Sequence, residues 1–542
     1  MQASLRAAPS QRDLFASRAL ARIPKILMLM DRNPHSPTYG CCDRNFWHYR
    51  IIDFPSGMAQ EFVWPLALAH HTEIPGNPFY GSAAIRAWVS AGIRFAAASA
   101  HSDGSCDDYY PHERALGASA FSLIATVESY KLIDLHDDGL LRFFEERARW
   151  LAGSEESGRL SNHLALVILC LQEAGRLLGT REWEAPARER LERLLDWQTD
   201  DGSFPEYEGF DPGYQTLTIS ALARILQNDS ENDRLADALE RAVRLTAAFM
   251  HPDGSFGGEY GSRNTYAYYP HGMELIGRWL PEALSINDRF AAGLAAGRAA
   301  CYEDDHVLAH EAWNYLLAWH DYVSERPDLP VSKKSTQWFQ SAGVLVDRRD
   351  DADLYIGTNK GGVFKLFVRG ELVGADTQVS LLVRSSRTPR NAVAHLMDEY
   401  SVELGEDSIH ISGHFGWAKS AGMTTGKLVL LRVLMSVFGR FFPDLVRKLL
   451  QRLLIVGKSR APFTFRRTFS WRGGRWHVRD EVRADRWDHV EAAGIGADQT
   501  SIYVVMSRPF QNGQLQGWTD LTSHVQDLTA GQPLVFERSF PR

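Results

Sequence analysis

Two stretches of the chain place side chains that can move protons at the start of expected helices. Tyr214 follows Pro212 and Gly213, and a tyrosine with a depressed pKa can act as a general base and then as a general acid. Asn162 and His163 open an earlier stretch of helical periodicity. Asparagine can donate a hydrogen bond to a carboxylate, and histidine can exchange a proton near neutral pH. Taken singly, each residue also fits a helix cap or a core position.

A repeated turn relates the two stretches. The tripeptide "DGS" occurs at 103–105, 201–203 and 253–255, which indicates a period of about 50 residues with one copy lost. Two helices and two loops fill such a period, and helical hairpins repeated in this way can close into an α/α toroid. Asp-Gly suits a tight turn that needs positive φ, so we expect each copy to be structural. Asn162 and Tyr214 are one period apart, and we expect them to face one cavity from neighbouring hairpins.

The loops that follow the turns carry further aromatic and polar residues. An arginine in the third loop, Arg263, can bind a carboxylate through two hydrogen bonds. Several such loops at one end of a toroid would form a cleft for a saccharide. The expected substrate-binding residues are Arg263, Tyr110, His112, Glu206, Trp47 and Tyr269, and His271 is a further candidate for catalysis.

The periodicity changes along the chain and predicts a multidomain α+β protein. Residues 60–325 repeat apolar positions at three- and four-residue steps and form the expected toroid, with 1–59 as an N-terminal extension packed on it. Short β-branched and aromatic stretches within 336–542 predict an antiparallel β-sandwich. The stretch 324–335 reads as the linker. The predicted architecture is therefore an N-terminal (α/α) toroid followed by a C-terminal β-sandwich.

One segment interrupts the β pattern. Residues 427–467 contain ten lysines and arginines against Asp444 alone, with apolar residues between the charges. We expect a basic amphipathic helical insertion over 427–457. Such a segment can lie on an anionic membrane, offer cations to an acidic polymer, or pack on the sheet with a solvated basic face.

The composition narrows the class of protein. The net charge is −8, which argues against a general nucleic-acid binder but leaves room for an anionic ligand in a local basic cleft. Five cysteines without a CxxC pair indicate neither a disulfide framework nor a zinc site. The first residues lack a signal-peptide pattern, so we expect a cytoplasmic protein, with peripheral membrane contact through 427–467 left open. No cofactor is expected, and a structural divalent metal in the β domain stays open.

The toroid, the β domain, and "NH" at 162–163 followed by "GY" at 213–214 resemble the heparinase II/III-like polysaccharide lyases and the related oligoalginate lyases. The resemblance implies that Asn162 and His163 neutralise a uronate carboxylate. This acidifies the proton at C5, which Tyr214 removes before it protonates the leaving oxygen. The implied partner is an acidic polysaccharide or oligosaccharide.

The chain departs from the family in one respect. Family members commonly carry a Gly-His-rich stretch in an early strand of the β domain, whereas the corresponding stretch here, 356–383, has no histidine. Either His271 or His112 supplies that role, or Lys360 replaces the histidine, or the chain carries out different chemistry.

Other functions remain open at this stage. A uronate C5-epimerase would use the same proton removal, and the residues do not distinguish it from a lyase. An inverting glycoside hydrolase would need two separated carboxylates, for which the sequence offers Asp103, Asp107, Asp201, Glu206, Glu208 and Asp211. A non-catalytic polysaccharide-binding or assembly protein is the third alternative.

Overall fold

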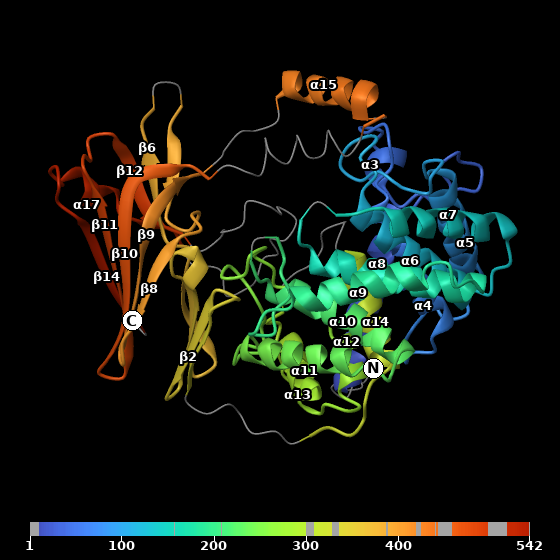
Figure 1. The fold of residues 1–542 in the computed structure, drawn as a ribbon, viewed down its shortest axis with the longest axis horizontal. Helices are drawn as coiled ribbons and strands as arrows, with labels where there is room; N and C mark the ends of the chain where they lie inside the picture. Colours follow the sequence, from blue (N-terminus) through green and yellow to red (C-terminus); the bar gives the residue numbers. More distant parts are fainter. Residues whose placement is uncertain are drawn as a thin grey trace, which may run out of the picture.

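The molecule has a helical half and a β half, which lie side by side in Figure 1. The computed structural model describes residues 10–156, 158–207, 209–299, 308–327, 335–385, 388–418, 424–439, 441–442, 458–496 and 517–540. The expectation for Glu208, for most of the linker and for 443–457 lies outside these residues.

The helical half is a closed ring of helix pairs. Each inner helix packs against the next, and the last one packs against the first. The inner helices are α4 (Val63–His71), α6 (Leu116–Leu132), α8 (Ser161–Leu178), α10 (Pro212–Asn228), α12 (His271–Ile276) and α14 (Leu308–His320). The outer helices are α5 (Ala83–Ala98), α7 (Asp138–Gly153), α9 (Glu184–Trp197), α11 (Asp233–Ala248), α13 (Glu282–Ala295) and α1 (Gln11–Leu20). The predicted toroid is confirmed.

Burial explains which helices lie inside. Nearly every residue of α10 is buried, including its threonines and serine, whereas α11 buries only one face. A helix that is buried all round must carry apolar or small residues on every side, and an outer helix needs an apolar stripe only. The sixth outer position is filled by α1, which packs on α14 and comes from the first twenty residues of the chain. The short elements α2 (Ile23–Leu29), α3 (Arg44–Trp47) and η1 (Met58–Phe62) connect α1 to α4.

The three DGS turns have one geometry. The glycines have φ values of 84°, 89° and 80° at Gly104, Gly202 and Gly254. A Cβ atom added to any of them would lie within 2.6 Å of the backbone of the outer helix that packs there, α7, α11 or α13 respectively. Only glycine fits such a position. The repeated turn therefore joins neighbouring hairpins of the ring.

The β half contains two antiparallel sheets. The five-stranded sheet has the order β1 (Ser335–Phe339), β2 (Val344–Arg349), β3 (Ala352–Gly357), β4 (Val363–Val368) and β5 (Glu371–Asp376), with the short η2 (Thr358–Lys360) after β3. The second sheet has the order β13 (Thr519–Asp520), β12 (Val490–Ile495), β6 (Val379–Val383), β7 (Arg390–Val393), β9 (Ser408–Trp417), β10 (Arg460–Arg472), β11 (Arg475–Ala484) and β14 (Leu534–Phe540). β8 (Tyr400–Leu404) pairs with β9, and α17 (Thr522–Gln526) packs on β12.

The five-stranded sheet is the middle layer of the molecule. Successive side chains of a strand point to opposite faces. Leu345 belongs to the core that the two sheets share, whereas its neighbours Val344 and Val346 belong to the core of the helical half. The sheet is therefore buried on both faces, and the predicted β-sandwich is backed directly by the toroid.

Polar contacts fix the two halves to each other. The backbone N–H groups of Ser341 and Ala342 donate to Oδ2 of Asp201, at 2.7 and 3.2 Å. Lys365 of β4 is buried and lies 3.4 Å from Oε2 of Glu259. The amine of Lys360 donates to the carbonyl oxygens of Glu259 and Gly261. The loop 257–265 of the helical half is thus held by the β domain.

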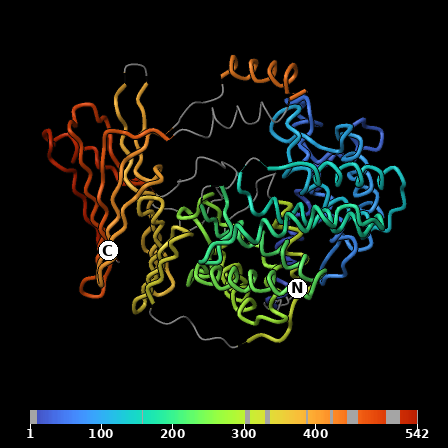
Figure 2. The backbone as a smooth tube through the Cα atoms, viewed as in Figure 1, coloured from blue at the N-terminus to red at the C-terminus, as the bar shows by residue number. Residues whose placement is uncertain are grey.

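The basic insertion is helical where the structure describes it. α15 (Thr425–Leu434) continues into a π-helical turn, Met435–Gly439, and lies near α3 in Figure 1. In Figure 2 the same orange segment stands above the blue N-terminal part of the chain. None of the helices in the described parts of the chain is long and apolar enough to cross a membrane.

Candidate active site

The carboxylate of Glu206, from the loop before α10, caps the first turn of α8. Oε1 of Glu206 accepts hydrogen bonds from the backbone N–H of Asn162, at 3.0 Å, and from its Nδ2, at 2.6 Å. The first N–H groups of a helix have no partner within the helix, and a negative charge there is favourable. Both side chains are buried, at 1% exposure each. Glu206 therefore orients the amide of Asn162.

A second carboxylate closes the start of α10. Oδ1 of Asp211 accepts from the backbone N–H of Tyr214 at 3.1 Å, as an N-cap does, and Pro212 occupies the first turn. Oδ2 of Asp211 accepts from the N–H groups of Arg263 and Thr265, at 3.1 and 3.3 Å. One buried carboxylate thus ties the helix that carries Tyr214 to the loop that carries Arg263.

Arg263 connects the two helix starts. Its guanidinium carbon lies 3.7 Å from the ring centroid of Tyr214 and 5.1 Å from that of Tyr207. Its Nη1 lies 3.3 Å from Oε2 of Glu206. Asn162, Glu206, Arg263 and Tyr214 therefore form one continuous group of contacts, which we call the Glu206 cluster.

Burial and charge oppose each other in this cluster. Burial raises the pKa of Glu206 above its ordinary value, although Arg263 and the amide of Asn162 act in the opposite direction. Burial would lower the pKa of Arg263, but the neighbouring Tyr214, Glu206 and Tyr207 raise it overall. The guanidinium stays charged, while the carboxyl group is the member of the pair that is closer to taking up a proton.

Two polar atoms of the cluster have no protein partner among the described residues. They are Oδ1 of Asn162 and Nε of Arg263, and both are buried. Buried polar atoms are nearly always hydrogen-bonded, so two unpaired ones in one cluster indicate a site that a polar ligand or water completes. One is an acceptor and the other is a donor.

Aromatic and titratable residues surround the cluster. Tyr109 is 60% exposed, and its phenol interacts electrostatically with Tyr214 and Arg263. Nδ1 of His163 lies 3.0 Å from Oε2 of Glu156, and the imidazole ring packs against Gly117 of α6. Burial, with the charge of Asp108, raises the pKa of Glu113 to about 8.

The backbone of these loops is unusual. Several residues other than glycine have positive φ: His112 (59°), Arg114 (50°), Tyr207 (58°) and Asn264 (61°). Non-glycine residues rarely adopt this conformation, and where they do they cluster at functional sites. Three of the loops around the Glu206 cluster therefore hold shapes that their sequences do not favour.

The remaining predicted site residues lie elsewhere. The imidazole of His271 contacts Asp321 at 2.9 Å and its backbone N–H donates to Asn314, neither of which belongs to the Glu206 cluster. Tyr269 is buried and its N–H donates to Thr216 of α10. Trp47 donates from Nε1 to the carbonyl of Leu29.

His112 and Tyr110 share the half-buried loop that also carries Tyr109. The backbone N–H of His112 donates to Asp107 at 2.7 Å, and its ring stacks on His101. The roles of these residues and of His271 in binding or catalysis stay predictions.

The roles of two residues of the site are not predicted from the sequence. Asp211 is expected there only as a possible hydrolase carboxylate, although "DPG" before a helical stretch is the signal of an N-cap with proline in the first turn. Tyr207, whose ring centroid lies 5.1 Å from the guanidinium carbon of Arg263, gives no signal, because its position depends on a positive φ that the sequence does not reveal.

The β domain reaches the site through Lys360. Burial lowers the pKa of its amine to about 7. His395, whose Nδ1 lies 2.8 Å from the carbonyl of Thr377, has a pKa lowered to about 4 by burial. The charge of Lys360 also acts to lower the pKa of His395. No group of three or more histidine, cysteine, aspartate or glutamate residues in the described ranges is arranged to hold a metal ion.

Comparison with known proteins places the fold. No protein-family model matches the sequence, and no curated protein does either. Among solved structures, a chondroitin AC lyase mutant from Streptomyces coelicolor matches over 98% of this chain and 79% of its own, with a TM-score of 0.50 and 13% identity.

Two further solved structures match less well. A heparinase III covers 92% of this chain and 74% of its own, with a TM-score of 0.42 and 11% identity. A heparan sulfate lyase mutant from Pedobacter heparinus covers 91% and 71%, with a TM-score of 0.40 and 10% identity. The chain has a polysaccharide lyase fold over nearly its whole length.

Proposed function

We propose that this chain is a polysaccharide lyase that cleaves a uronate-containing acidic polysaccharide or oligosaccharide by β-elimination. The fold supports the class of enzyme, and the Glu206 cluster supports the chemistry. The observation that carries the proposal is the position of Arg263, 3.7 Å from the ring of Tyr214 and 3.3 Å from the carboxylate that orients Asn162.

The first step is proton removal. The second N–H of the Asn162 amide, with His163 beside it, would bind the uronate carboxylate and neutralise its charge. Neutralisation makes the proton at C5 more acidic. The phenolate of Tyr214 then takes the proton from C5, and the charge that develops on the carboxylate is stabilised by the donors already in place. The guanidinium over the ring of Tyr214 favours the phenolate, because a positive charge lowers the energy of a nearby negative one.

The second step breaks the glycosidic bond. The electron pair from the C5–H bond forms a double bond between C4 and C5, and the bond from C4 to the glycosidic oxygen breaks. The phenol of Tyr214 returns its proton to that oxygen. The enzyme regains its starting state, and the product carries a 4,5-unsaturated sugar at its new non-reducing end.

The hydrolase alternative has less support. Asp103 and Asp201 accept hydrogen bonds at tight turns and at the domain interface, and Asp211 is saturated by backbone donors and Thr265. An inverting hydrolase needs two carboxylates that act on the sugar and on a water from opposite sides, whereas these three carboxylates are engaged in contacts within the protein. A C5-epimerase would share the first step and lack the second.

The test follows the unsaturated product. We expect ultraviolet absorbance to rise when the protein is incubated with one member of a panel of uronate polymers. Tyr214→Phe should lower kcat/KM by about 10²- to 10⁴-fold, which is the contribution of a general acid–base group. Tyr80→Phe, on the surface of the helical half, is the matched control and should retain full activity.

Three results would contradict the proposal. They are full activity in Tyr214→Phe, new reducing ends without absorbance, and inversion at C5 without cleavage. The last two would favour the hydrolase and the epimerase respectively.

A further inference from the structure

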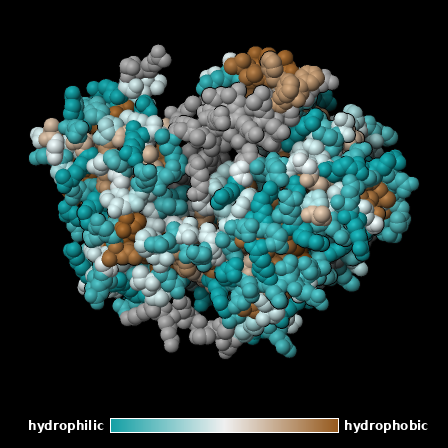
Figure 3. All heavy atoms as spheres, in the orientation of Figure 1, coloured by the Kyte–Doolittle hydropathy of each residue, from teal (hydrophilic) through white to brown (hydrophobic). Residues whose placement is uncertain are grey.

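The largest concentration of exposed apolar side chains lies on one short segment. Half of the large hydrophobic residues that are exposed in the described chain fall within 428–442. They are Leu428, Val429, Leu430, Val433, Val437, Phe438, Phe441 and Phe442, with exposures from 44% to 69%. They form the brown patch at the top of Figure 3. We call them the α15 patch. A contiguous patch of this kind marks an interaction surface, whereas single exposed apolar residues need no explanation.

The patch follows the geometry of the helix. Val429 and Val433 are four residues apart in α15, so they lie on one face of the helix. Val437, Phe438, Phe441 and Phe442 follow the helix in sequence and are also exposed. No residue of α15 itself is buried. The ten residues of α15 span about 15 Å, half the thickness of a bilayer core, which suits a helix lying in an interface.

Arg432 holds α15 against the helical half. Arg432 donates to the carboxylate of Asp53 at 2.6 Å, and its guanidinium lies 5.3 Å from the ring of Phe54. This contact leaves the apolar residues of the α15 patch exposed.

The sequence that surrounds the patch residues is positively charged. Between 424 and 458 the sequence contains Asp444 as its one acidic residue, against seven basic residues: Lys427, Arg432, Arg440, Arg447, Lys448, Arg452 and Lys458. The whole chain carries −8, so this segment is opposite in sign to the rest of the molecule. Apolar side chains flanked by basic residues are the pattern of helices that bind anionic lipid surfaces.

We propose that α15 and the turn after it bind an anionic lipid membrane, with the α15 patch inserted among the headgroups and first acyl carbons. The other occupants fit the chemistry less well. A second copy of the chain would bring two basic segments together, and like charges at an interface oppose association. An acidic polysaccharide would match the charge, but it offers no apolar phase in which to bury three phenylalanines.

The experiment uses the full chain and sedimentation with two kinds of vesicle, phosphatidylcholine alone and phosphatidylcholine mixed with phosphatidylserine. We expect binding to the mixed vesicles that weakens as salt is added, because the attraction of basic residues is screened. The variant F438S/F441S/F442S removes exposed side chains and should bind at least about tenfold more weakly. The matched control L404S/W518S removes exposed apolar residues of the β half and should bind like the wild type.

The proposal fails if the wild-type chain does not sediment with mixed vesicles, or if the triple variant binds as well as the wild type. Equal binding to neutral vesicles that is insensitive to salt would overturn the requirement for anionic lipid. Analytical ultracentrifugation without lipid identifies the competing occupant. Concentration-dependent dimerisation that the triple variant abolishes, with no vesicle binding, would assign the patch to a second copy of the chain.

Discussion

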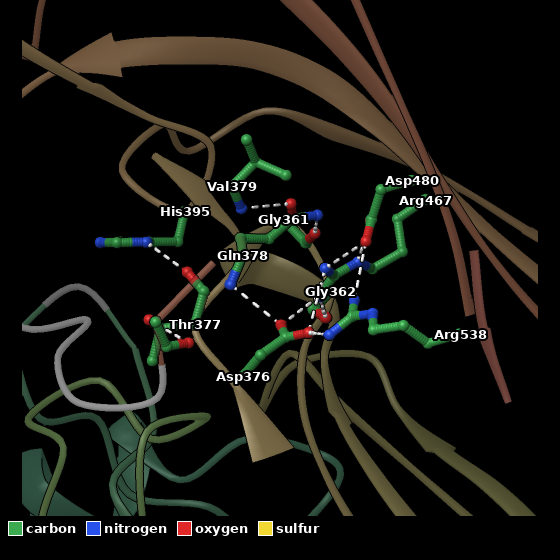
Figure 4. Close-up of polar contacts among 11 residues, drawn as sticks. Gly361, Gly362, Asp376, Thr377, Gln378, Val379, His395, Arg467, Asp480 and Arg538 are labelled. Carbon is green, nitrogen blue, oxygen red and sulfur yellow. Dashed lines mark hydrogen bonds and ion pairs between the residues drawn. The ribbon is translucent and has the colours of Figure 1, made fainter. Parts of the chain in front are cut away.

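Two buried clusters of charged side chains differ in how completely their carboxyl groups are matched by cations. In the β half, Arg467 donates from all three of its nitrogens to Asp376, Asp480 and the carbonyl of Gly362. Arg538 binds the same two carboxylates, so all four carboxylate oxygens accept hydrogen bonds (Figure 4). In the Glu206 cluster, by contrast, a buried acceptor of Asn162 and a buried donor of Arg263 are unpaired among the described residues.

The pKa values of Asp376 and Glu206 are shifted in opposite directions, although burial acts on both in the same way. Burial raises the pKa of Asp376, but the charges of Arg467 and Arg538 outweigh it and hold the pKa below its ordinary value. Burial also raises the pKa of Glu206, and the single nearby arginine does not outweigh it. Two cations stabilise the charged form of a carboxyl group more than one cation does.

The difference in pairing distinguishes charges that stabilise the fold from charges that can bind a substrate. In the β cluster every carboxylate oxygen and every nitrogen of Arg467 has a partner, so this cluster serves the packing of the β half, although Nε of Arg538 is unpaired among the described residues. A cluster with unpaired atoms beside a tyrosine and an arginine retains hydrogen-bonding capacity for a substrate. Removal of one partner should therefore cost stability in the first cluster and activity in the second.

The largest expected effect concerns the β cluster. Arg467→Met leaves two buried carboxylates with one cation, and breaking a buried ion pair from one side costs about 3–5 kcal/mol. Urea unfolding followed by circular dichroism should show this loss. Arg466→Met, the next residue of β10, is the matched control, because its side chain is half exposed and pairs with Glu403 at the surface. A surface pair contributes at most about 1 kcal/mol. Equal stability of the two variants would contradict the structural role.

The same isosteric change in both clusters sharpens the comparison. Glu206→Gln keeps the size of the side chain and its contact with the Asn162 amide, but weakens the attraction for Arg263. We expect kcat/KM to fall by about 10- to 100-fold, because Arg263 and Asn162 are held less firmly. The midpoint of unfolding should stay close to that of the wild type, because burial already disfavours the charged form of Glu206. Asp376→Asn should give the reverse, a large loss of stability, because two arginines lose a charged partner.

For both variants we would measure kcat/KM on the uronate polymer that the wild type accepts, and the midpoint of thermal unfolding. If Glu206→Gln unfolds like Asp376→Asn, the two clusters do not differ in kind.

The sequence predicts the ring well and the site only in part. The DGS turns mark each hairpin because only glycine fits against the outer helix, so the requirement is visible in the residue itself. The contact of Asn162 with Glu206 joins residues 44 positions apart through a loop, and no local pattern encodes it. The outer position of α1 is equally hidden, since α1 carries no DGS turn and lies far in sequence from α14.

The β half shows a second limit. Val344, Leu345 and Val346 are consecutive apolar residues, which predict a strand buried on both faces. These three residues do not indicate which face of the strand packs against the toroid. That choice depends on shape at the interface, where Asp201, Lys360 and Lys365 find their partners.

The smallest expected effect concerns Lys360, which links the two halves at the loop that carries Arg263. Lys360→Met removes the donors to the carbonyls of Glu259 and Gly261, and we expect kcat/KM to fall a few-fold as the loop loosens.

The pH dependence of the stability that Lys360 contributes is the sharper readout. The pKa of the amine falls from 10.5 to about 7 on folding because of burial, so between these values the unfolded chain binds more protons than the folded chain. Stability from this residue therefore rises with pH across that window and is lost as pH falls towards 7. The methionine variant lacks this dependence, so the difference in unfolding midpoint between wild type and variant should widen by a few degrees from neutral to alkaline pH. A constant difference would mean that Lys360 keeps its proton in the folded protein, and that the β domain holds the loop with a full charge instead of a neutral amine.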